Sequence, residues 1–150
     1  MAKTSELPGI AEIDKVVIGN KSRKQYIKEA IKENKCFIAK KGSSIVGFLI
    51  YNTNFFECSF IALVIISPSE RRKGYAKLLI NYFESKSITK KIFSSTNQSN
   101  ENMQKLFDSI GYIKSGYVEN LDDEDPEIVY FKNVNNSAIS CSRERSNVDA

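Results

Sequence analysis

The sequence predicts a mixed α/β fold, in which about four helices flank a central β-sheet, and three observations carry this prediction. Residues 60–66 are apolar at every position, as in a central strand covered on both faces. Pro68 ends this strand because proline has no N–H group for the ladder, and Gly74 then leads into apolar residues at helical spacing. A second helical stripe runs from Met103 to Ile110.

Two helices and two strands are expected ahead of the central strand. The first helix begins over residues 4–8, and the second follows a capping box formed by Ser22 and Gln25. Strands are predicted over residues 36–39 and 45–51. A turn at residues 52–54 would then return the chain to the central strand.

In the second half of the chain, the sequence predicts a strand over residues 91–96, then a helix and two final strands. Ser99 or Asn97 would cap the helix, and Gly111 would end it. The final strands are expected over residues 112–118 and 127–131. We expect residues 1–133 to form one domain and the polar residues 134–150 to form a disordered tail.

The composition excludes several classes of function. The 150 residues include no histidine, which excludes histidine triads and histidine-ligated zinc. The three cysteines (Cys36, Cys58 and Cys141) lack metal-ligand spacing, so we expect free thiols and no metal. No apolar run is long enough to cross a membrane and no signal peptide is evident, so a cytoplasmic protein is expected. The net charge of +4 is too mild to indicate nucleic-acid binding.

The segment after the central strand has the features of an anion site. A glycine turn that opens a helix presents free backbone N–H groups and the positive end of the helix dipole. The spacing Arg71-x-x-Gly74-x-Ala76 resembles the acyl-CoA signature of the GNAT acetyltransferase superfamily. The resemblance implies that main-chain amides bind the pyrophosphate of acetyl-CoA, at Arg71, Arg72, Lys73, Gly74, Tyr75 and Ala76.

A second segment is also similar to this family, and the predicted order of helices and strands matches the family fold from residue 4 to about residue 133. Asn100 is followed seven residues later by the aromatic Phe107 and then by Gly111-Tyr112, which is the family register. The resemblance implies that Asn100 hydrogen-bonds the pantetheine arm, with Met103 and Phe107 also at the acyl donor. The family normally has a strand before the first helix, and we expect that strand to be short or missing here because at most residues 1–3 could form it. The pantetheine would pair with backbone groups of Val64, Ile65 and Ile66, and the N–H of Ile66 or of its neighbour would polarise the thioester carbonyl.

Two departures leave the acid and the base open. The family usually has tyrosine where Phe107 stands, and phenylalanine has no proton for the leaving thiolate. Tyr112 and Tyr117 are candidate substitutes, although both also suit a strand that packs a sheet. Ala62 stands where many relatives carry glutamate. Glu57 is the candidate base; the alternatives are an exposed strand-end charge at Glu57, a water chain, or an amine that binds already deprotonated.

The acceptor is expected to be a cationic amine that attacks directly in a ternary complex. The most acidic stretch of the chain contains Glu119, Asp122 and Asp125, which would attract a polyamine, an aminoglycoside-like compound or a lysine side chain. A solvated turn is the alternative for this stretch. A non-catalytic acyl-CoA sensor with the same fold is the rival function. A homodimer through Tyr130 and Phe131 is a further expectation, with burial in the core as its alternative.

Overall fold

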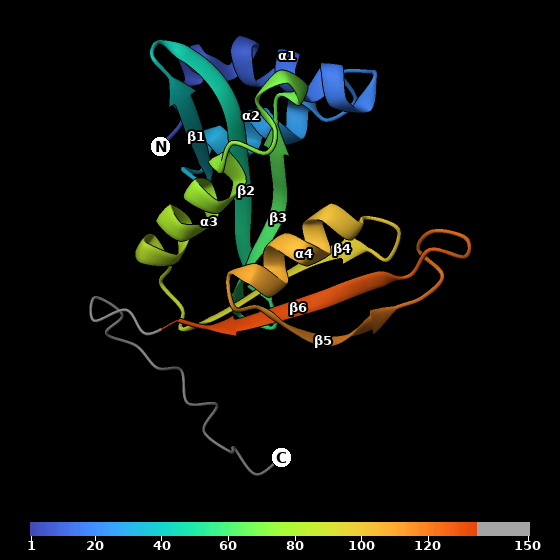
Figure 1. Ribbon diagram of the computed structural model, residues 1–150. Helices are drawn as coiled ribbons and strands as arrows, with labels where there is room; N and C mark the ends of the chain where they lie inside the picture. Colours follow the sequence, from blue (N-terminus) through green and yellow to red (C-terminus); the bar gives the residue numbers. More distant parts are fainter. Residues whose placement is uncertain (135–150) are drawn as a thin grey trace. The chain divides into compact units, whose positions relative to one another are not determined.

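The computed structural model describes residues 1–134 (Figure 1). The predicted tail and Cys141 lie outside the described residues, apart from Val134. The chain divides into two compact units. Unit 1 comprises Met1–Asn52 and Ile61–Phe83, and unit 2 comprises Thr53–Phe60 and the chain from Glu84 onward.

Most of the helices belong to unit 1. A short 3-10 helix, η1, precedes the first α-helix, and the Lys3 N–H donates to Glu6 Oε1 (2.9 Å) at its start. A second 3-10 helix, η2, follows the third strand. The elements that lie in unit 1 or begin there are η1 (Thr4–Glu6), α1 (Leu7–Ile18), α2 (Lys24–Lys32), β1 (Cys36–Lys41), β2 (Ser44–Phe55), η2 (Pro68–Glu70) and α3 (Tyr75–Lys86), together with all but the first residues of β3 (Cys58–Ile66).

The sheet has the strand order β1-β2-β3-β4-β6-β5. The remaining elements belong to unit 2 and are β4 (Lys91–Asn97), α4 (Glu101–Ser109), β5 (Ile113–Val118) and β6 (Glu127–Asn133). Strand β1 pairs antiparallel with β2, and β6 pairs antiparallel with both β4 and β5. The described residues thus contain four α-helices and six strands, which confirms the predicted class. None of the helices in this part of the chain is long and apolar enough to cross a membrane.

The core of unit 1 lies between the first two helices and the strands. Ile10, Ile27 and Phe48 are fully buried there, and Leu63 and Ile65 of β3 pack against this cluster. The expectation that β3 is covered on both faces is wrong in part. Ile61 is buried, but residues 62–66 are all only half-buried, including Leu63 and Ile65 that pack against the core.

Two local predictions, for the start of α2 and for the turn after β2, are wrong. Arg23, not Ser22, precedes α2, and it makes no capping bond from its side chain. Its guanidinium instead forms a bidentate pair with the buried Asp14, at 2.5 and 3.1 Å, which ties α2 to α1. The predicted turn at residues 52–54 is part of β2. The chain reverses at Phe56 and Glu57, whose φ angles of 49° and 64° suit a tight hairpin without glycine.

Helix α4 lies over one face of β4 and β6 (Figure 1), and the core of unit 2 lies between them. The Phe107 and Tyr130 rings stack there at 4.7 Å, and both side chains are fully buried. Gly111 follows α4 with a φ of 90°, as predicted for the residue after a helix. The Tyr112 N–H then donates to the Phe107 carbonyl at 2.9 Å, which closes a Schellman motif. Because Tyr130 is buried, the expectation that its ring contacts a second copy is wrong.

Candidate functional site

The turn between β3 and α3 is shaped by two residues with positive φ angles. Arg71 is extended, Arg72 has a φ of 62°, and Gly74 has a φ of 88°. Glycine adopts this conformation without steric cost. A Cβ atom added to Gly74 would meet no described atom within 4 Å. Gly74 is therefore required by its backbone angle, and the space beside it is open to a ligand.

The first turn of α3 begins directly after Gly74. The Leu78 N–H donates to the Gly74 carbonyl at 3.0 Å and makes the first helical bond. The N–H groups that precede it have no carbonyl of the same helix to bind, as at every helix start. The 12-residue helix adds the positive end of its dipole at this point. The turn can therefore hold an anion through backbone groups.

Basic side chains surround the turn, and one acid is already neutralised. Glu70 contacts Lys73 at 3.0 Å and Lys41 at 3.5 Å. These contacts, chiefly the hydrogen bond from Lys73, hold the pKa of Glu70 below its usual value. Arg71 reaches back with Nε to the Ile66 carbonyl at 3.4 Å. The charge of Glu70 is thus paired with these two lysines, so the net charge around the turn is positive.

One hydrogen bond shows which edge of the strand each N–H group faces at the end of β3. The Ser67 N–H donates to the Val46 carbonyl of β2 at 2.8 Å. Successive residues of a strand direct their N–H and C=O groups to opposite edges, so Ile65 also faces β2. The N–H groups of Ile66 and Val64 therefore lie on the edge of β3 that faces away from β2. The N–H groups of Val64 and Ile66 thus face the edge that their predicted roles require. The backbone groups of Ile65 face β2 instead.

A glycine of β2 that the sequence analysis missed shapes the end of β3. A Cβ atom on Gly47 would lie 2.5 Å from Ile66 Cδ1 and 2.9 Å from the Ile65 carbonyl oxygen. Real Cβ atoms do not approach other atoms so closely, so only glycine fits. The available signal was a glycine inside an otherwise apolar strand, which marks close approach of another backbone.

Asn100 begins α4 and caps it. Its Oδ1 atom accepts a hydrogen bond from the Met103 N–H at 3.2 Å. The prediction that Ser99 or Asn97 caps this helix is therefore wrong. Phe107 is fully buried on the inner face of α4, and Met103 is half-buried. Capping uses the oxygen of Asn100, so its amide group is the donor that a ligand would meet.

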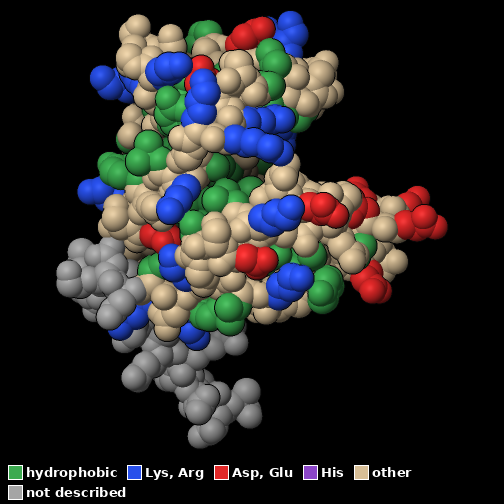
Figure 2. Space-filling model, viewed as in Figure 1, with side chains coloured by type: hydrophobic (Ala, Val, Ile, Leu, Met, Phe, Trp, Pro, Cys, Tyr) green, Lys and Arg blue, Asp and Glu red, His purple; other side chains and the backbone are tan. Residues whose placement is uncertain are grey.

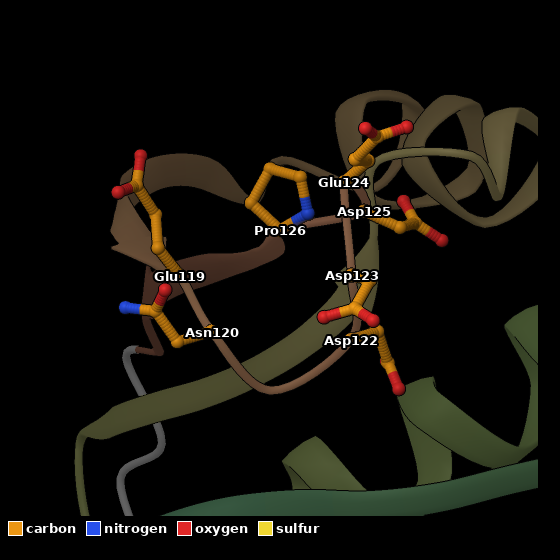
Figure 3. A pocket seen from close by; sticks show the side chains of 7 residues that line it. All are labelled: Glu119, Asn120, Asp122, Asp123, Glu124, Asp125 and Pro126. Carbon is orange, nitrogen blue, oxygen red and sulfur yellow. The ribbon is translucent and has the colours of Figure 1, made fainter.

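The loop between β5 and β6 lines a shallow hollow of about 260 Å³ (Figure 3). Asp122 accepts a hydrogen bond from Asn97 Nδ2 at 2.8 Å. Asp125 accepts two bonds from Ser99, at 2.9 Å from its N–H and 2.6 Å from its hydroxyl. The expectation that Asp122 and Asp125 are available for a substrate is corrected, because both carboxylates tie the loop to the end of β4. Glu119 is exposed.

Tyr112 is a poor candidate for the acid. Its side chain is buried, and its hydroxyl donates to Glu84 Oε2 at 3.3 Å. Lys132 contacts the same carboxylate at 2.8 Å. Burial, followed by the charge of Glu84, raises the pKa of Tyr112 far above its usual value. The expected catalytic role of Tyr112 is therefore corrected to a structural one.

The other two candidate catalytic residues of unit 2 lie at its surface. Glu57 is exposed on the tight turn between β2 and β3. Tyr117 lies on β5 with 58% of its surface exposed. Residues 71–76, which were predicted to bind the pyrophosphate, belong instead to unit 1.

The two units differ in charge. Unit 1 contains 14 basic and 6 acidic residues, a formal net charge of +8. The described part of unit 2 contains 6 basic and 10 acidic residues, a formal net charge of −4. Figure 2 shows the acidic side chains gathered over the loop between β5 and β6. Unit 1 therefore favours an anionic ligand and unit 2 a cationic one.

Comparison with known proteins decides the family. The model of the acetyltransferase (GNAT) family matches residues 8–112. The chain belongs to the GNAT acetyltransferase family. A GNAT acetyltransferase structure from Bacillus cereus is 55% identical, with a TM-score of 0.86 over 88% of this chain and 93% of that chain. No curated protein matches the sequence.

Two more distant structures share the fold of this GNAT protein. The ribosomal-protein-S18-alanine N-acetyltransferase of Escherichia coli is 13% identical, with a TM-score of 0.78 over 94% of this chain and 96% of that chain. A Bacillus anthracis structure described as a streptothricin acetyltransferase, solved with acetyl coenzyme A, is 19% identical. Its TM-score is 0.59 over 67% of this chain and 62% of that chain. These two matches bear on the fold alone.

Proposed function

We propose that this GNAT protein transfers an acetyl group from acetyl-CoA to a primary amine. The turn from Arg71 to Ala76 carries the proposal. It combines an open glycine, the unpaired N–H groups of a helix start and an excess of basic side chains. These features fit the pyrophosphate of acetyl-CoA, which carries negative charge and several acceptor oxygens.

The β3 edge supplies the second part of the proposal. In the proposed complex, the Ile66 N–H on the edge facing away from β2 donates to the thioester carbonyl. A single donor of this kind is worth about 3 kcal/mol in acyl transfer. Val64 offers backbone groups on the same edge for the pantetheine amides. In unit 2, the side-chain amide of Asn100 is a further donor, and the family resemblance assigns it to acetyl-CoA.

The chemistry requires that the amine attack as the free base. A new C–N bond forms at the acetyl carbonyl carbon, the C–S bond breaks, and the amine loses a proton. Phe107 and the buried Tyr112 leave the thiolate without a tyrosine donor at these positions. The CoA thiolate therefore leaves as the anion or takes its proton from water. Glu57 remains the candidate base, through a water.

The same observations favour a second function. A protein that binds acetyl-CoA without turnover needs the turn after β3 and needs neither an acid nor a base. Ala62 and Phe107 stand where many relatives carry catalytic side chains, and Tyr112 is committed to Glu84. The experiment must therefore distinguish an acetyltransferase from an acyl-CoA sensor.

Calorimetric titration with acetyl-CoA tests the proposal. Gly74→Asp places a carboxylate at the proposed pyrophosphate site, and Gly42→Asp is the matched control. Gly42 also has a positive φ angle, of 62°, and a Cβ atom there would meet no described atom within 4 Å. We expect Gly74→Asp to abolish binding and Gly42→Asp to retain it. Thiol release with a panel of amines would then support the transferase. Binding without release would support the sensor, and no binding by the parent protein would contradict both.

A further inference from the structure

Unit 2 has a sheet face that α4 does not cover. Along β4, Ile92, Ser94 and Thr96 are buried beneath the helix, and the alternate residues are exposed or half-buried. Strand β6 shows the same alternation, with Ile128 and Tyr130 buried. The opposite face therefore exposes apolar surface within the described part of unit 2.

Aromatic rings form a continuous row on this open face. The ring of Phe93 lies 5.0 Å from that of Phe55 and 5.2 Å from that of Phe131. Phe56 continues the row at 5.0 Å from Phe55, and 69% of its surface is exposed. Such rings are common anchors for protein partners.

A hollow of about 460 Å³ lies beside this row, and all of its lining residues belong to unit 2. Phe55, Phe56 and Phe93 line it from β2, its turn and β4. Gly116 and Tyr117 of β5 and Val129 of β6 complete its apolar lining. This volume accommodates one or two side chains of a ligand.

Strand β5 forms the edge of the sheet beside this hollow. It ends the strand order, and all six of its residues are exposed. An edge strand presents unpaired N–H and C=O groups, to which an extended peptide adds by main-chain hydrogen bonds. Alternate side chains of an added strand would point to the face that carries the hollow.

Charge identifies the kind of peptide. Strand β5 leads directly into the loop of residues 119–125. Asp122 and Asp125 of this loop already accept hydrogen bonds from Asn97 and Ser99. Glu119, Asp123 and Glu124 are the exposed carboxylates that a basic side chain can meet. Gly116 precedes Glu119 by three residues, which corresponds to about 10 Å along a strand. A peptide along β5 with an apolar side chain in the hollow would therefore place a residue two to four positions away beside the carboxylates.

We propose that the aromatic hollow, the β5 edge and the acidic loop together bind an extended basic peptide. Its apolar side chain enters the hollow, and its lysine or arginine lies against loop 119–125. This inference rests on the proposed function only in identifying the peptide as part of the acetyl acceptor, which would then be a protein. The aromatic row, the hollow and the edge strand carry the binding itself.

Fluorescence anisotropy with the full chain tests the inference. The probe is a labelled eight-residue peptide with one phenylalanine and two lysines placed two to four residues later. Matched peptides carry glutamate in place of lysine, or N-methyl groups at alternate backbone positions. We expect the basic peptide to bind with a micromolar Kd that weakens with added salt, and at least tenfold weaker binding of both matched peptides.

Surface variants locate the site. Phe56→Ala and Tyr117→Ala each truncate an exposed ring, and we expect each to weaken binding at least fivefold. Val16→Ala on α1 is the control, since Val16 is 59% exposed and lies in unit 1. Unchanged affinity in both ring variants would overturn the inference. Equal affinity for the glutamate peptide would also overturn it.

Two further measurements separate this inference from its alternatives. Analytical ultracentrifugation asks whether a second copy occupies the β5 edge. A dimer that Tyr117→Ala dissociates, with no peptide binding, would overturn the inference. Calorimetry with acetyl-CoA on the same variants tests the proposed function separately. Peptide binding without acetyl-CoA binding would support the docking surface and contradict only the acetyl transfer.

Discussion

The Ser67 N–H donates to the Val46 carbonyl at 2.8 Å, and this bond sets the direction of the backbone groups at the end of β3. It places the Ile66 N–H on the edge facing away from β2. The side chain of Ile66 meanwhile covers Gly47. The proposed oxyanion donor is therefore positioned by the packing of two strands of unit 1.

Gly47→Ala should disturb this arrangement. The added methyl group would lie 2.5 Å from Ile66 Cδ1 and 2.9 Å from a backbone oxygen, so β3 must shift. We expect the free energy of unfolding to fall by about 1–3 kcal/mol and the affinity for acetyl-CoA to fall as well. Urea unfolding and calorimetry measure the two effects. Gly9→Ala is the control, because its nearest neighbour is the end of a flexible side chain at 3.2 Å. An equally stable Gly47→Ala would contradict the close approach.

Substitutions of Asn100 separate its two roles. Asn100→Ala removes the cap and should lower the free energy of unfolding by about 1 kcal/mol. Asn100→Asp retains the capping oxygen but removes the amide donor, so we expect near-normal stability and weaker acetyl-CoA binding. Thermal unfolding and calorimetry on the same samples give both values. Normal binding by Asn100→Asp would show that the amide does not reach the pantetheine.

Phe107→Tyr restores the residue usual in the family, but the ring is fully buried between Tyr112 and Tyr130. A buried hydroxyl without a partner costs about 1–3 kcal/mol. We expect this loss in urea unfolding, together with no gain in turnover. Phe83→Tyr, at another buried ring in unit 1, should lose a similar amount. A large gain in turnover with unchanged stability would show that the hydroxyl reaches the leaving thiolate.

Cys36 should make the fold sensitive to alkali. Burial raises the pKa of its thiol from 9.0 to about 12. The neutral thiol is thus favoured in the folded state, so its stabilising contribution is complete below pH 9 and declines as the pH rises toward 12. The loss should be about 1 kcal/mol by pH 10. Urea unfolding between pH 7 and pH 10 should show a smaller decline for Cys36→Ala. Parallel declines would exclude the Cys36 thiol as the cause.

The ion pair of Lys132 and Glu84 should stabilise unit 2. Lys132 contacts Glu84 at 2.8 Å and donates to the Ile110 carbonyl at 2.7 Å. Lys132→Met leaves the carboxylate, of which only 11% is exposed, without its cation. We expect a loss of about 2 kcal/mol, somewhat less than for a fully buried pair. The double variant Glu84→Gln with Lys132→Met should recover part of this loss. No recovery would show that the two charges are not coupled.

The sequence by itself determined the order of the elements and the turn after β3. Apolar periodicity is a local property, so the helices and most strands followed from it. Helix and strand ends were predicted from single residues. Proline (Pro68) has no N–H group for a strand ladder, and glycine (Gly74 and Gly111) adopts positive φ angles without steric cost. The family resemblance rested on these same positions, and comparison confirmed it.

The tertiary structure decided which polar side chains are free of bonds within the protein and which are already engaged in them. Asp122, Asp125 and Tyr112 were candidates by residue type, but their hydrogen bonds join segments that lie 25 to 28 residues apart. Only the folded chain brings Asn97, Ser99 and Glu84 to these groups. The aromatic row on unit 2 likewise joins residues 55, 93 and 131. A pattern in the sequence reports neighbours along the chain, and these contacts depend on neighbours across the sheet.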